Sequence, residues 1–491
     1  MSTYLHEMPV IHIAVCGGGL AGYMTAAALS RHLPATYRIT FIVTDETPST
    51  DIFYGSVTAP SAYDFNLSVG VSEPALVLES NSAFSLGTHY QAWGEDGRSW
   101  VQGFQLPLPI LNGVQFHQYL TRQGIDTLEP YLVSAAAAKR GVFAHPPEQA
   151  ANPLSRSEYG YQLDASAYSR LFALGIAPSR ICIIRAGITE IQASTEGIGA
   201  LHLSDGQRVS ADMFIDCTGP EGLLLGRLGA RPAGRRGLGA AMSLTPGETL
   251  GPAVRTLTGR PFGWQSITPL QGATAKLTVF SEEDECLALT AHGDDVDARA
   301  NAAPGRQAQA WIGNCVAIGQ AAAVVEPLTP APIMLLQGDI ERLISLIPLS
   351  RDMAMERREF NRRFADDHEY AELFQRALFA TAPVAPSGYW KAAQGAAEDT
   401  KLVRKLTQFL SRGSLVSYDL EPFTPEDWTI LHYGMGRRPR RSDRLADQAP
   451  EAQVKQYLSD LQRDIVASTG GLPSHHSYMS GLKRFLLQKS S

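Results

Sequence analysis

The stretch Ile11-His-Ile-Ala-Val-Cys-Gly-Gly-Gly-Leu-Ala-Gly-Tyr-Met-Thr-Ala-Ala-Ala-Leu-Ser-Arg-His-Leu33 predicts a buried strand, a glycine turn and a helix. Gly17, Gly19 and Gly22 have the G-x-G-x-x-G spacing of a dinucleotide-binding turn. The first glycine permits the tight turn, the second lets the backbone approach a pyrophosphate, and the third lets the helix pack closely on the strand. Free N–H groups at the helix start would hold the phosphates. We therefore predict a dinucleotide site, against the simpler interpretation of a purely structural turn.

An acidic residue follows the second predicted strand. Residues 38–44 predict this strand, and Asp45 comes directly after it, 23 residues beyond Gly22. A carboxylate near this position usually binds a ribose hydroxyl of the dinucleotide. Asp45 and Glu46 therefore have two interpretations, as ribose ligands or as part of a solvated loop, and both stay open.

Two later segments also end in glycine turns. Residues 206–219 predict a strand pair, and residues 311–320 predict a further strand. A buried strand that closes on a glycine turn is typical of a cofactor edge. The candidate cofactor-binding residues are Gly17, Gly19, Leu20, Ala21, Gly22, Asp45, Asp216, Thr218, Gly219 and Gly319.

The separation of these segments predicts an α/β (α+β) fold in which a Rossmann-like cofactor domain is assembled from distant pieces. We expect the cofactor domain to comprise 1–54, 166–229 and 301–345, a substrate-binding layer to comprise 55–165 and 230–300, and 346–491 to form a helical C-terminal region. Helical periodicity in Arg351–Phe379 and Lys401–Leu410 supports the last assignment. The basic run Arg437–Arg441 is interpreted as a solvated loop, with contact to an acidic partner as the alternative.

Composition narrows the class of protein. The chain has 491 residues, a formal net charge of −7 and five cysteines without a C-x-x-C pair. The charge argues against nucleic-acid binding, and the cysteines predict neither a metal site nor a disulfide framework. A signal peptide is not evident, and the apolar run near Val316–Val325 is too short to span a bilayer. We therefore expect a soluble cytoplasmic protein without membrane contact.

Further blocks accompany the glycine turn, which has the form Gly-Gly-Gly-x-Ala-Gly-Tyr-Met. In chain order they are Thr58 with Pro60, Asn81–Phe84, Tyr159–Asp164, Phe214–Gly219, Asn314–Gly319, Glu326–Leu328, Ile340–Leu343, Asp427–Thr429 and Pro473–His476. Together they resemble the flavin-dependent tryptophan halogenase family over nearly the whole chain. The resemblance implies that the cofactor is FAD and that the first domain has the flavin monooxygenase and halogenase type of fold.

The chain departs from this family where halogenation takes place. In the family, reduced FAD and O₂ form a C4a-hydroperoxide that oxidises halide, and a lysine and a glutamate then deliver the halogen. Ser85 occupies the lysine position, and Thr329 occupies the glutamate position. Backbone donors that help to hold chloride in the family are replaced by Pro330 and Pro332, which lack an N–H. We therefore expect that the halide site of the family is lost in this chain.

A third departure lies in the family's Gly-Trp-x-Trp-x-Ile-Pro wall, which reads Gly263-Trp-Gln-Ser-Ile-Thr-Pro269 here. Trp264 matches, whereas Ser266 replaces the second tryptophan. An indole buries about 150 to 250 Å², so its loss either opens a route from flavin to substrate or is compensated by neighbouring side chains. The candidate substrate-route residues are Ser85, Trp264, Ser266 and Thr329, and the catalytic residue stays unassigned.

Without a halide site, the resemblance implies direct oxygen transfer from the flavin hydroperoxide to an electron-rich aromatic ring, here an indole or tryptophan, free or within a peptide or protein. This would be similar to the flavoprotein monooxygenase of quinohemoprotein amine dehydrogenase cofactor biogenesis. NAD(P)H or a partner flavin reductase would supply the electrons. The alternatives are a halogenase with atypical catalytic residues and a catalytically silent FAD-binding assembly factor.

A general base beside the ring would assist oxygen transfer. The predicted substrate layer offers His89, His117, Asp64 and Glu129. For each of them a structural role is the interpretation that we favour.

Overall fold

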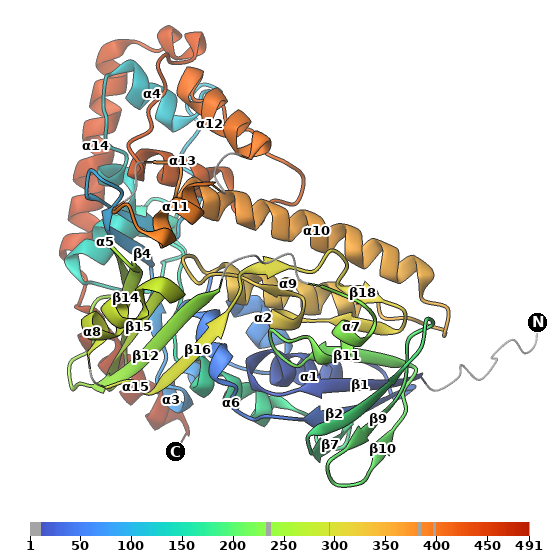
Figure 1. The fold of residues 1–491 in the computed structure, drawn as a ribbon. Helices are drawn as coiled ribbons and strands as arrows, with labels where there is room; N and C mark the ends of the chain where they lie inside the picture. Colours follow the sequence, from blue (N-terminus) through green and yellow to red (C-terminus); the bar gives the residue numbers. More distant parts are fainter. Residues whose placement is uncertain (1–10, 232–236, 294, 382–383, 396–398, 491) are drawn as a thin grey trace, which may run out of the picture.

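The glycine-rich first segment forms the centre of a six-stranded sheet in the computed structural model of the chain (Figure 1). The structure describes residues 11–231, 237–293, 295–381, 384–395 and 399–490. Parts of the predicted segments lie outside the described residues: 1–10 of the cofactor domain, 232–236 and 294 of the substrate layer, and 382–383, 396–398 and 491 of the C-terminal region.

The six-stranded sheet has the order β18-β19-β11-β1-β2-β7. Its strands are β1 (Ile11–Gly17), β2 (Tyr37–Val43), β7 (Ile181–Arg185), β11 (Met213–Cys217), β18 (Trp311–Ile312) and β19 (Cys315–Ala317). β1 runs parallel to both neighbours, and its Val15 lies between Phe41 of β2 and Ile215 of β11. Strands buried on both faces of a parallel sheet need apolar side chains throughout, which explains the apolar run before the glycine turn.

The segment 311–320 forms a hairpin instead of the single strand that we expected. β18 and β19 pair antiparallel, and the 3-10 turn η5 (Gly319–Ala321) follows them. Gly313 in the hairpin turn has φ +57°, and a Cβ atom there would lie 2.7 Å from the backbone oxygen of Glu196. The chain therefore reverses at a glycine that no periodicity argument could detect.

The second large sheet has seven strands in the order β16-β12-β15-β14-β13-β4-β5. They are β4 (Gly87–Trp93), β5 (Arg98–Gly103), β12 (Leu238–Pro246), β13 (Arg255–Arg260), β14 (Gly263–Leu270), β15 (Ala273–Ser281) and β16 (Ala298–Ala302). All neighbours are antiparallel except β13 and β4, which run parallel. This sheet draws strands from both segments of the predicted substrate layer, although the predicted domain boundaries themselves stay predictions.

The remaining strands form smaller sheets. They are β3 (Ala83–Ser85) with β6 (Gly160–Gln162), β8 (Ile188–Ala193), β9 (Ile198–Leu203) and β10 (Arg208–Val209), and β17 (Gly305–Arg306) with β20 (Ala323–Val324). β10 and β11 therefore belong to different sheets, so the two strands predicted within residues 206–219 do not pair with each other.

Helices cover the sheets and form the C-terminal region. They are α1 (Gly19–His32), α2 (Ala62–Ser68), α3 (Glu73–Glu79), α4 (Phe116–Arg122), α5 (Val133–Arg140), α6 (Ala165–Gly175), α7 (Leu223–Arg227), α8 (Glu285–His292), α9 (Ala331–Ser345), α10 (Ala354–Ala377), α11 (Gly388–Gly395), α12 (Thr400–Arg412), α13 (Pro425–Gly434), α14 (Glu451–Gly470) and α15 (His475–Ser490). Helices α10 and α12 confirm the two amphipathic helices that periodicity predicted. Among the described helices, none is long and apolar enough to cross a membrane.

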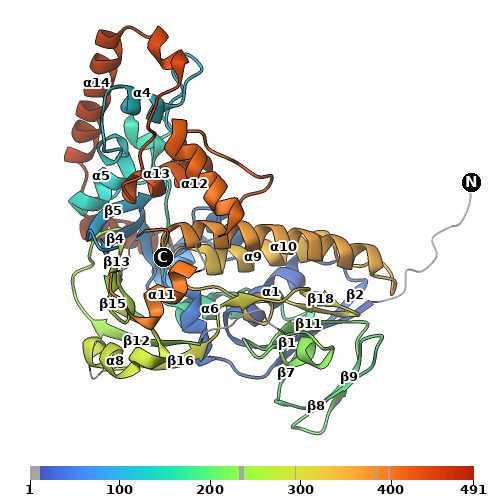
Figure 2. The same cartoon turned by 45° about the horizontal axis from the view of Figure 1, so that its top comes forward.

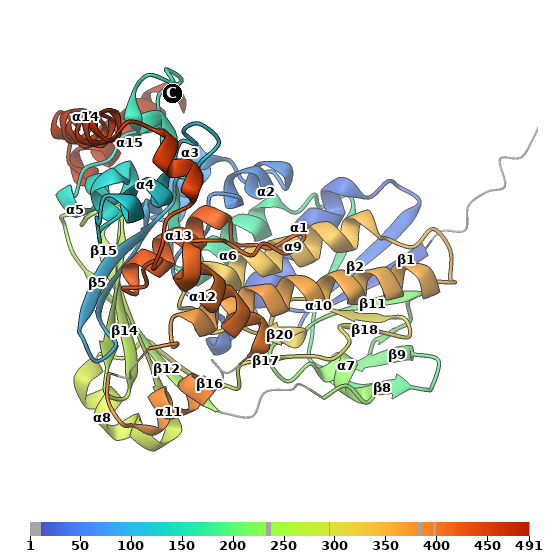
Figure 3. The same cartoon turned by 90° about the horizontal axis from the view of Figure 1, so that it is seen from above.

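The helices α9 and α10 link the six-stranded sheet and its helix α1 to the C-terminal helices. α1 is buried from Gly19 to Ser30 because it packs against α6 and α9 as well as against the sheet. α9 and α10 lie side by side above the six-stranded sheet (Figure 3). α10 then extends toward the C-terminal helices α12 and α13 (Figure 2). Helix α1, which follows the glycine turn, is thus packed on several sides.

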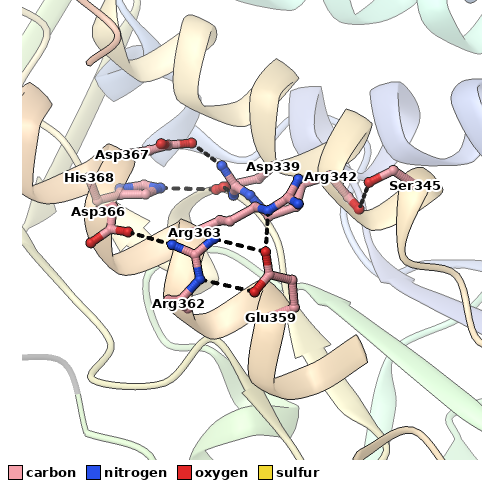
Figure 4. Close-up of polar contacts among 9 residues, drawn as sticks. All are labelled: Asp339, Arg342, Ser345, Glu359, Arg362, Arg363, Asp366, Asp367 and His368. Atoms are coloured by element: carbon pink, nitrogen blue, oxygen red, sulfur yellow. Dashed lines mark hydrogen bonds and ion pairs between the residues drawn. The ribbon is translucent and has the colours of Figure 1, made fainter. Parts of the chain in front are cut away.

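An ion cluster joins α9 to α10. Arg342 of α9 lies between Asp339 and Asp367 and pairs with both (Figure 4). His368 Nε2 lies 3.0 Å from Asp339 Oδ2. Arg342, Asp339 and His368 are buried, and loss of one partner from such a buried cluster costs about 3 to 5 kcal/mol. The cluster fixes α10, and with it the start of the C-terminal region, on α9.

Candidate dinucleotide site and adjoining cavity

The glycine turn leaves no room for side chains. Gly17 has φ +127°, and a Cβ atom there would lie 2.1 Å from the backbone oxygen of Cys217. A Cβ atom on Gly18 would lie 1.5 Å from the backbone oxygen of Asp45, and one on Gly22 would lie 3.2 Å from Gly17. The turn is therefore held between β11, the end of β2 and its own helix, as the predicted dinucleotide turn requires.

A carboxylate of the chain itself lies on this turn. Leu20 N, at the start of α1, donates a hydrogen bond of 2.8 Å to Asp51 Oδ2. Gly19 has φ +59°, and a Cβ atom there would lie 2.5 Å from the same oxygen. A helix start attracts anions through its free N–H groups and its dipole. The Leu20 N–H is a donor of the kind that binds a phosphate, and in the structure the Asp51 carboxylate accepts from it.

The Asp51 side chain is poorly solvated. Its pKa is raised to about 7, mainly by burial; the bond from Leu20 N opposes this shift, and nearby Asp45 and Asp164 contribute to it. Near neutral pH the group therefore exists as both acid and carboxylate. Its charge decides how strongly it competes with an anion at the helix start.

The turn η1 (Ser49–Tyr54), which carries Asp51, also touches the other two predicted cofactor turns. A Cβ atom on Gly219 would lie 3.7 Å from Thr50 Oγ1, and one on Gly319 would lie 2.5 Å from the Tyr54 hydroxyl. Gln320 N donates to that hydroxyl at 3.2 Å. The cavity beside Tyr54 and Gly319 measures about 10 Å³. The structure thus brings all three predicted turns together around η1.

In the structure, Asp216 shapes the turn that follows β11. Asp216 is fully buried, and its Oδ1 accepts bonds from the N–H and the hydroxyl of Thr218. Its Oδ2 accepts bonds from Leu224 N and Leu225 N at the start of α7. Both oxygens are therefore used to shape the turn after β11, and a contact between Asp216 and the cofactor stays a prediction.

The proposed ribose ligands lie in the loop after β2. Asp45 is exposed, and its Oδ1 accepts a hydrogen bond of 3.0 Å from Thr47 N. Glu46 is exposed and pairs with Arg185. Both interpretations of Asp45 stay open, whereas Glu46 is engaged on the surface.

Ser85 lies at the end of β3 with 0% of its surface exposed. Its hydroxyl donates to the Gly87 oxygen at 3.2 Å and accepts from Gly87 N at 3.3 Å. The hydroxyl thus stabilises the turn into β4. A buried hydroxyl used in this way offers neither the amine nor the space for the lysine of the family.

The segment after Glu326 is equally changed. Thr329 is 3% exposed, and its hydroxyl accepts hydrogen bonds from Ala331 N and from Gln375 Nε2. Pro330 and Pro332 flank Ala331 at the start of α9. Two of the backbone positions therefore have no N–H, and the N–H between them is already used. The start of α9 therefore has few N–H donors that could bind a halide ion.

A buried arginine that the sequence analysis missed holds the same segment. Arg255 is 0% exposed and donates to the Pro327 oxygen at 2.8 Å and to the Leu328 oxygen at 2.6 Å. The Tyr90 hydroxyl donates to the Leu328 oxygen as well, at 2.9 Å. Burial lowers the pKa of Arg255 to about 10. A single arginine at a strand start carries no motif, so only its contacts reveal this role.

Trp264 and Thr329 each form a hydrogen bond with a residue that lines a large cavity. Trp264 Nε1 donates to Glu326 Oε1 at 2.6 Å, and the Tyr389 hydroxyl donates to the same oxygen at 2.5 Å. Glu326, Tyr389 and Gln375, the partner of Thr329, line a cavity of about 970 Å³. Its walls also include Leu238, Arg306, Val325 and Phe379. A mostly apolar cavity of this size is typical of a site for a small aromatic ligand.

Ser266, by contrast, is a packed residue of β14. It is fully buried and lies opposite Leu257 of β13 and Leu277 of β15. Its hydroxyl has no hydrogen-bond partner within the described residues. A passage at Ser266 would therefore need neighbouring side chains to move, and the packing interpretation agrees better with its surroundings.

The four candidate bases lie elsewhere. His117 is buried beside the Gly413 oxygen, and His89 Nε2 lies 2.9 Å from Ser99 Oγ. Glu129 pairs with Lys139, and Asp64 lies beside a different, smaller cavity. The large cavity is not lined by any of the four. The structural interpretation of each agrees with this placement.

Comparison with known proteins agrees with this architecture. The tryptophan halogenase family model matches residues 12–451. Tryptophan 7-halogenase KtzQ of Kutzneria sp. (strain 744) is 25% identical, over 80% of this chain and 81% of its own length. The structure of BrvH, a flavin-dependent halogenase from Brevundimonas sp. BAL3, has a TM-score of 0.87 at 28% identity and covers 96% of this chain and 99% of its own. A flavin-dependent halogenase from Xanthomonas campestris has a TM-score of 0.87 at 25% identity, over 96% and 98% of the two chains.

Proposed function

Because this chain belongs to the tryptophan halogenase family, we propose that it is a flavin-dependent enzyme that hydroxylates an electron-rich aromatic ring instead of halogenating it. The observation that carries the proposal is the pair of buried hydroxyls at Ser85 and Thr329. They stand where the resemblance places the lysine and the glutamate of halogen delivery. A hydroxyl forms no haloamine and Thr is no carboxylate, so the steps after flavin oxidation cannot follow the family's course.

The residues of the glycine turn would hold FAD. Gly17, Gly19 and Gly22 allow the close approach, and Leu20 N would donate to a phosphate oxygen once Asp51 leaves it. When bound and reduced, FAD supplies the electrons that convert one O₂ and one ring C–H into a ring C–OH and water. NAD(P)H or a partner flavin reductase would restore the reduced flavin.

The chain's own residues shape the place where the ring would lie. Arg255 and Tyr90 hold the carbonyl oxygens before Thr329, so that this segment keeps one position. Trp264 and Tyr389 fix the Glu326 carboxylate at the border of the large cavity. The cavity is the expected site of the aromatic substrate, and its size suits an indole, a free tryptophan or a tryptophan side chain of a peptide.

The test supplies reduced FAD, ¹⁸O₂ and catalase to the protein together with tryptophan, indole or a tryptophan-containing peptide, in the presence of bromide and chloride. We expect a product with one labelled oxygen by mass spectrometry, and no effect of either halide. Catalase removes free peroxide, so that a labelled product reports oxygen transfer within the protein. A reaction without the protein is the control.

Two outcomes would overturn the proposal. A brominated or chlorinated product would show a halogenase that uses other residues for delivery. Bound FAD without substrate-dependent O₂ consumption would show a catalytically silent flavoprotein that serves as an assembly factor.

A further inference from the structure

Three arginines meet where α13 ends beside the seven-stranded sheet. Arg98 begins β5, and Arg437 and Arg438 follow α13. Two glycines allow this approach: a Cβ atom on Gly436 would lie 1.9 Å from Arg98 Nη1, and one on Gly434 would lie 2.4 Å from the Trp100 ring. The run that begins at Arg437 was expected to be a solvated loop, and this is wrong for its first residue, because Arg437 is only 8% exposed.

Backbone oxygens accept from two of these arginines. Arg437 Nη2 donates to the oxygens of Ala377 and Ala380, at the end of α10. Arg438 Nη1 donates to the oxygens of Tyr433 and Arg437, and its guanidinium lies 4.3 Å from the centre of the Tyr433 ring. These contacts hold both guanidinium groups in place, but they carry no negative charge.

Each of the three arginines keeps one buried nitrogen without an acceptor in the described part of the chain. These nitrogens are Arg98 Nε, Arg437 Nη1 and Arg438 Nε. A buried, charged donor that lacks an acceptor destabilises the fold, because it has lost its contact with water and gained no partner. Three such donors in one place indicate a missing partner, because most buried polar groups in proteins are paired.

The local charge is compensated only in part, because Asp126 acts on Arg438 without forming an ion pair with it. Burial, followed by the repulsion from Arg98, lowers the pKa of Arg437 to about 10. Among the described carboxylates, Asp96 is the one that pairs with any of the three arginines, and it is largely exposed. Glu129, which lies nearby, already accepts from Lys139 and Val101 N.

A cavity of about 280 Å³ lies beside these groups. Arg98 and Arg438 line it from opposite elements, together with Trp100, Tyr433, Ser99 and Thr127. The volume admits one small ligand and excludes a helix or a strand of a partner protein. The Glu129 carboxylate also lines the cavity, but Lys139 and Val101 N already donate to it.

We propose that this cavity binds a small oxyanion, a carboxylate or a phosphate group, between Arg98 and Arg438. The planar guanidinium group presents donors in a fork that matches both kinds of oxyanion. The bound oxygens would accept from the Nε atoms of Arg98 and Arg438, and the negative charge would lower the repulsion among the three arginines. The same chemistry is offered by free phosphate and by the carboxylate of a small molecule.

The proposed anion site lies near the segment around Thr329 but is not part of it. Trp100 in its wall stacks on Tyr90 with ring centres 4.5 Å apart, and the Tyr90 hydroxyl donates to the Leu328 oxygen beside Thr329. The rings of Trp100 and Tyr90 would therefore separate an anion in this cavity from the segment that carries Thr329. The proposal stands on the arginines alone and does not depend on the hydroxylase activity.

The test titrates the full chain with inorganic phosphate and, separately, with acetate by isothermal calorimetry, at constant ionic strength set with sodium chloride. We expect saturable binding of one anion, with a Kd raised about tenfold or more in Arg98→Met and in Arg438→Met. Arg440→Met removes an exposed arginine of the same basic run and should leave the Kd unchanged. Binding of phosphate alone would assign the site to phosphate compounds, and binding of both would extend it to carboxylates.

Two results would overturn the proposal: no saturable binding to the wild-type chain, or equal binding by all three variants. The second result would place the anion elsewhere, for example at the start of α1. If the arginine variants unfold, crystals of the wild-type chain soaked in selenate supply an independent measurement. Anomalous density is expected within hydrogen-bond distance of Arg98 Nε and Arg438 Nε, and density only at other places would contradict the site.

Discussion

Two segments of the chain belong to the proposed path from cofactor to substrate: the glycine turn between β1 and α1, and the segment around Thr329. The first retains the residues of the family pattern, whereas the second does not. The turn keeps its glycines, and backbone atoms of Cys217 and Asp45 leave no room for a Cβ atom at Gly17 and Gly18. The Thr329 segment keeps its position through Arg255 and Tyr90, but its chemical groups have changed. The glycine turn is thus constrained by close backbone contacts. The reaction, by contrast, depends on a few side chains that packing alone does not require.

The largest effect is expected at the turn itself. Gly17→Ala places a Cβ atom 2.1 Å from a backbone oxygen at φ +127°, so we expect a loss of about 4 kcal/mol or more in the free energy of unfolding. FAD binding should be lost with it. Gly206→Ala is the matched control, since Gly206 has φ +85° but no atom within 4 Å of the added Cβ, and it should cost about 1 kcal/mol. Urea denaturation measures both, and equal costs would contradict the close approach at Gly17.

The second test restores the family's groups in the changed segment. Ser85→Lys and Thr329→Glu each put a charge at a buried position, so we expect each single variant to lose about 3 kcal/mol of stability. Neither variant, nor the double variant, should form halogenated product, because Pro330 and Pro332 still lack N–H donors. Ser85→Ala serves as the control. Halogenation by Ser85→Lys alone, detected by mass spectrometry, would show that the rest of the halide site is intact.

A third test distinguishes the effect of the Asp51 carboxylate on FAD binding from the effect of the glycine turn on which it lies. The pKa of Asp51 is raised from 3.8 to about 7 in the folded chain, so its charged form destabilises the fold, and this cost sets in as the pH rises above 3.8 and is complete above about 7. The same charge opposes a phosphate at Leu20 N. FAD affinity of the wild-type chain should therefore fall between about pH 6 and pH 8.

Asp51→Asn keeps the shape of the side chain and removes this charge. We expect FAD to bind the variant about tenfold more tightly at pH 8, with little pH dependence, as measured by quenching of flavin fluorescence. The carboxylates of Asp45 and Asp164, which face Asp51, remain in the variant. Asp205→Asn, at an exposed loop, is the control. Equal pH profiles for the wild-type chain and Asp51→Asn would contradict competition at the helix start.

The smallest effect is expected at Ser266. Ser266→Ala removes a buried hydroxyl that has no partner in the described residues, so stability should change by less than about 1 kcal/mol. Ser266→Trp inserts an indole between Leu257 and Leu277 and should cost about 1 to 3 kcal/mol or more. Thermal denaturation distinguishes the two. Full stability of Ser266→Trp would reveal free space at this position and favour a route there.

Much of the fold could be predicted from local patterns. The apolar runs and glycine spacing predicted β1, α1 and β2, and helical periodicity predicted α10 and α12. The hairpin of β18 and β19 was missed because its reversal depends on Gly313, whose approach to Glu196 is a long-range contact. The contact of Asp216 with the cofactor stays a prediction, because a carboxylate at a strand end has the same sequence pattern whether it binds a ligand or caps the next helix.

The amino-acid sequence alone identified the dinucleotide turn, the family resemblance and the missing lysine and glutamate, since these depend on residue type and spacing along the chain. It could not show that Asp51 lies on the turn, that Arg255 holds the Thr329 segment, or that Arg98 meets Arg437 and Arg438. Each of these contacts joins residues that lie 31 to 340 positions apart. Such contacts arise when the strands and helices pack, because burial then brings distant charges together and removes the water that would otherwise separate them.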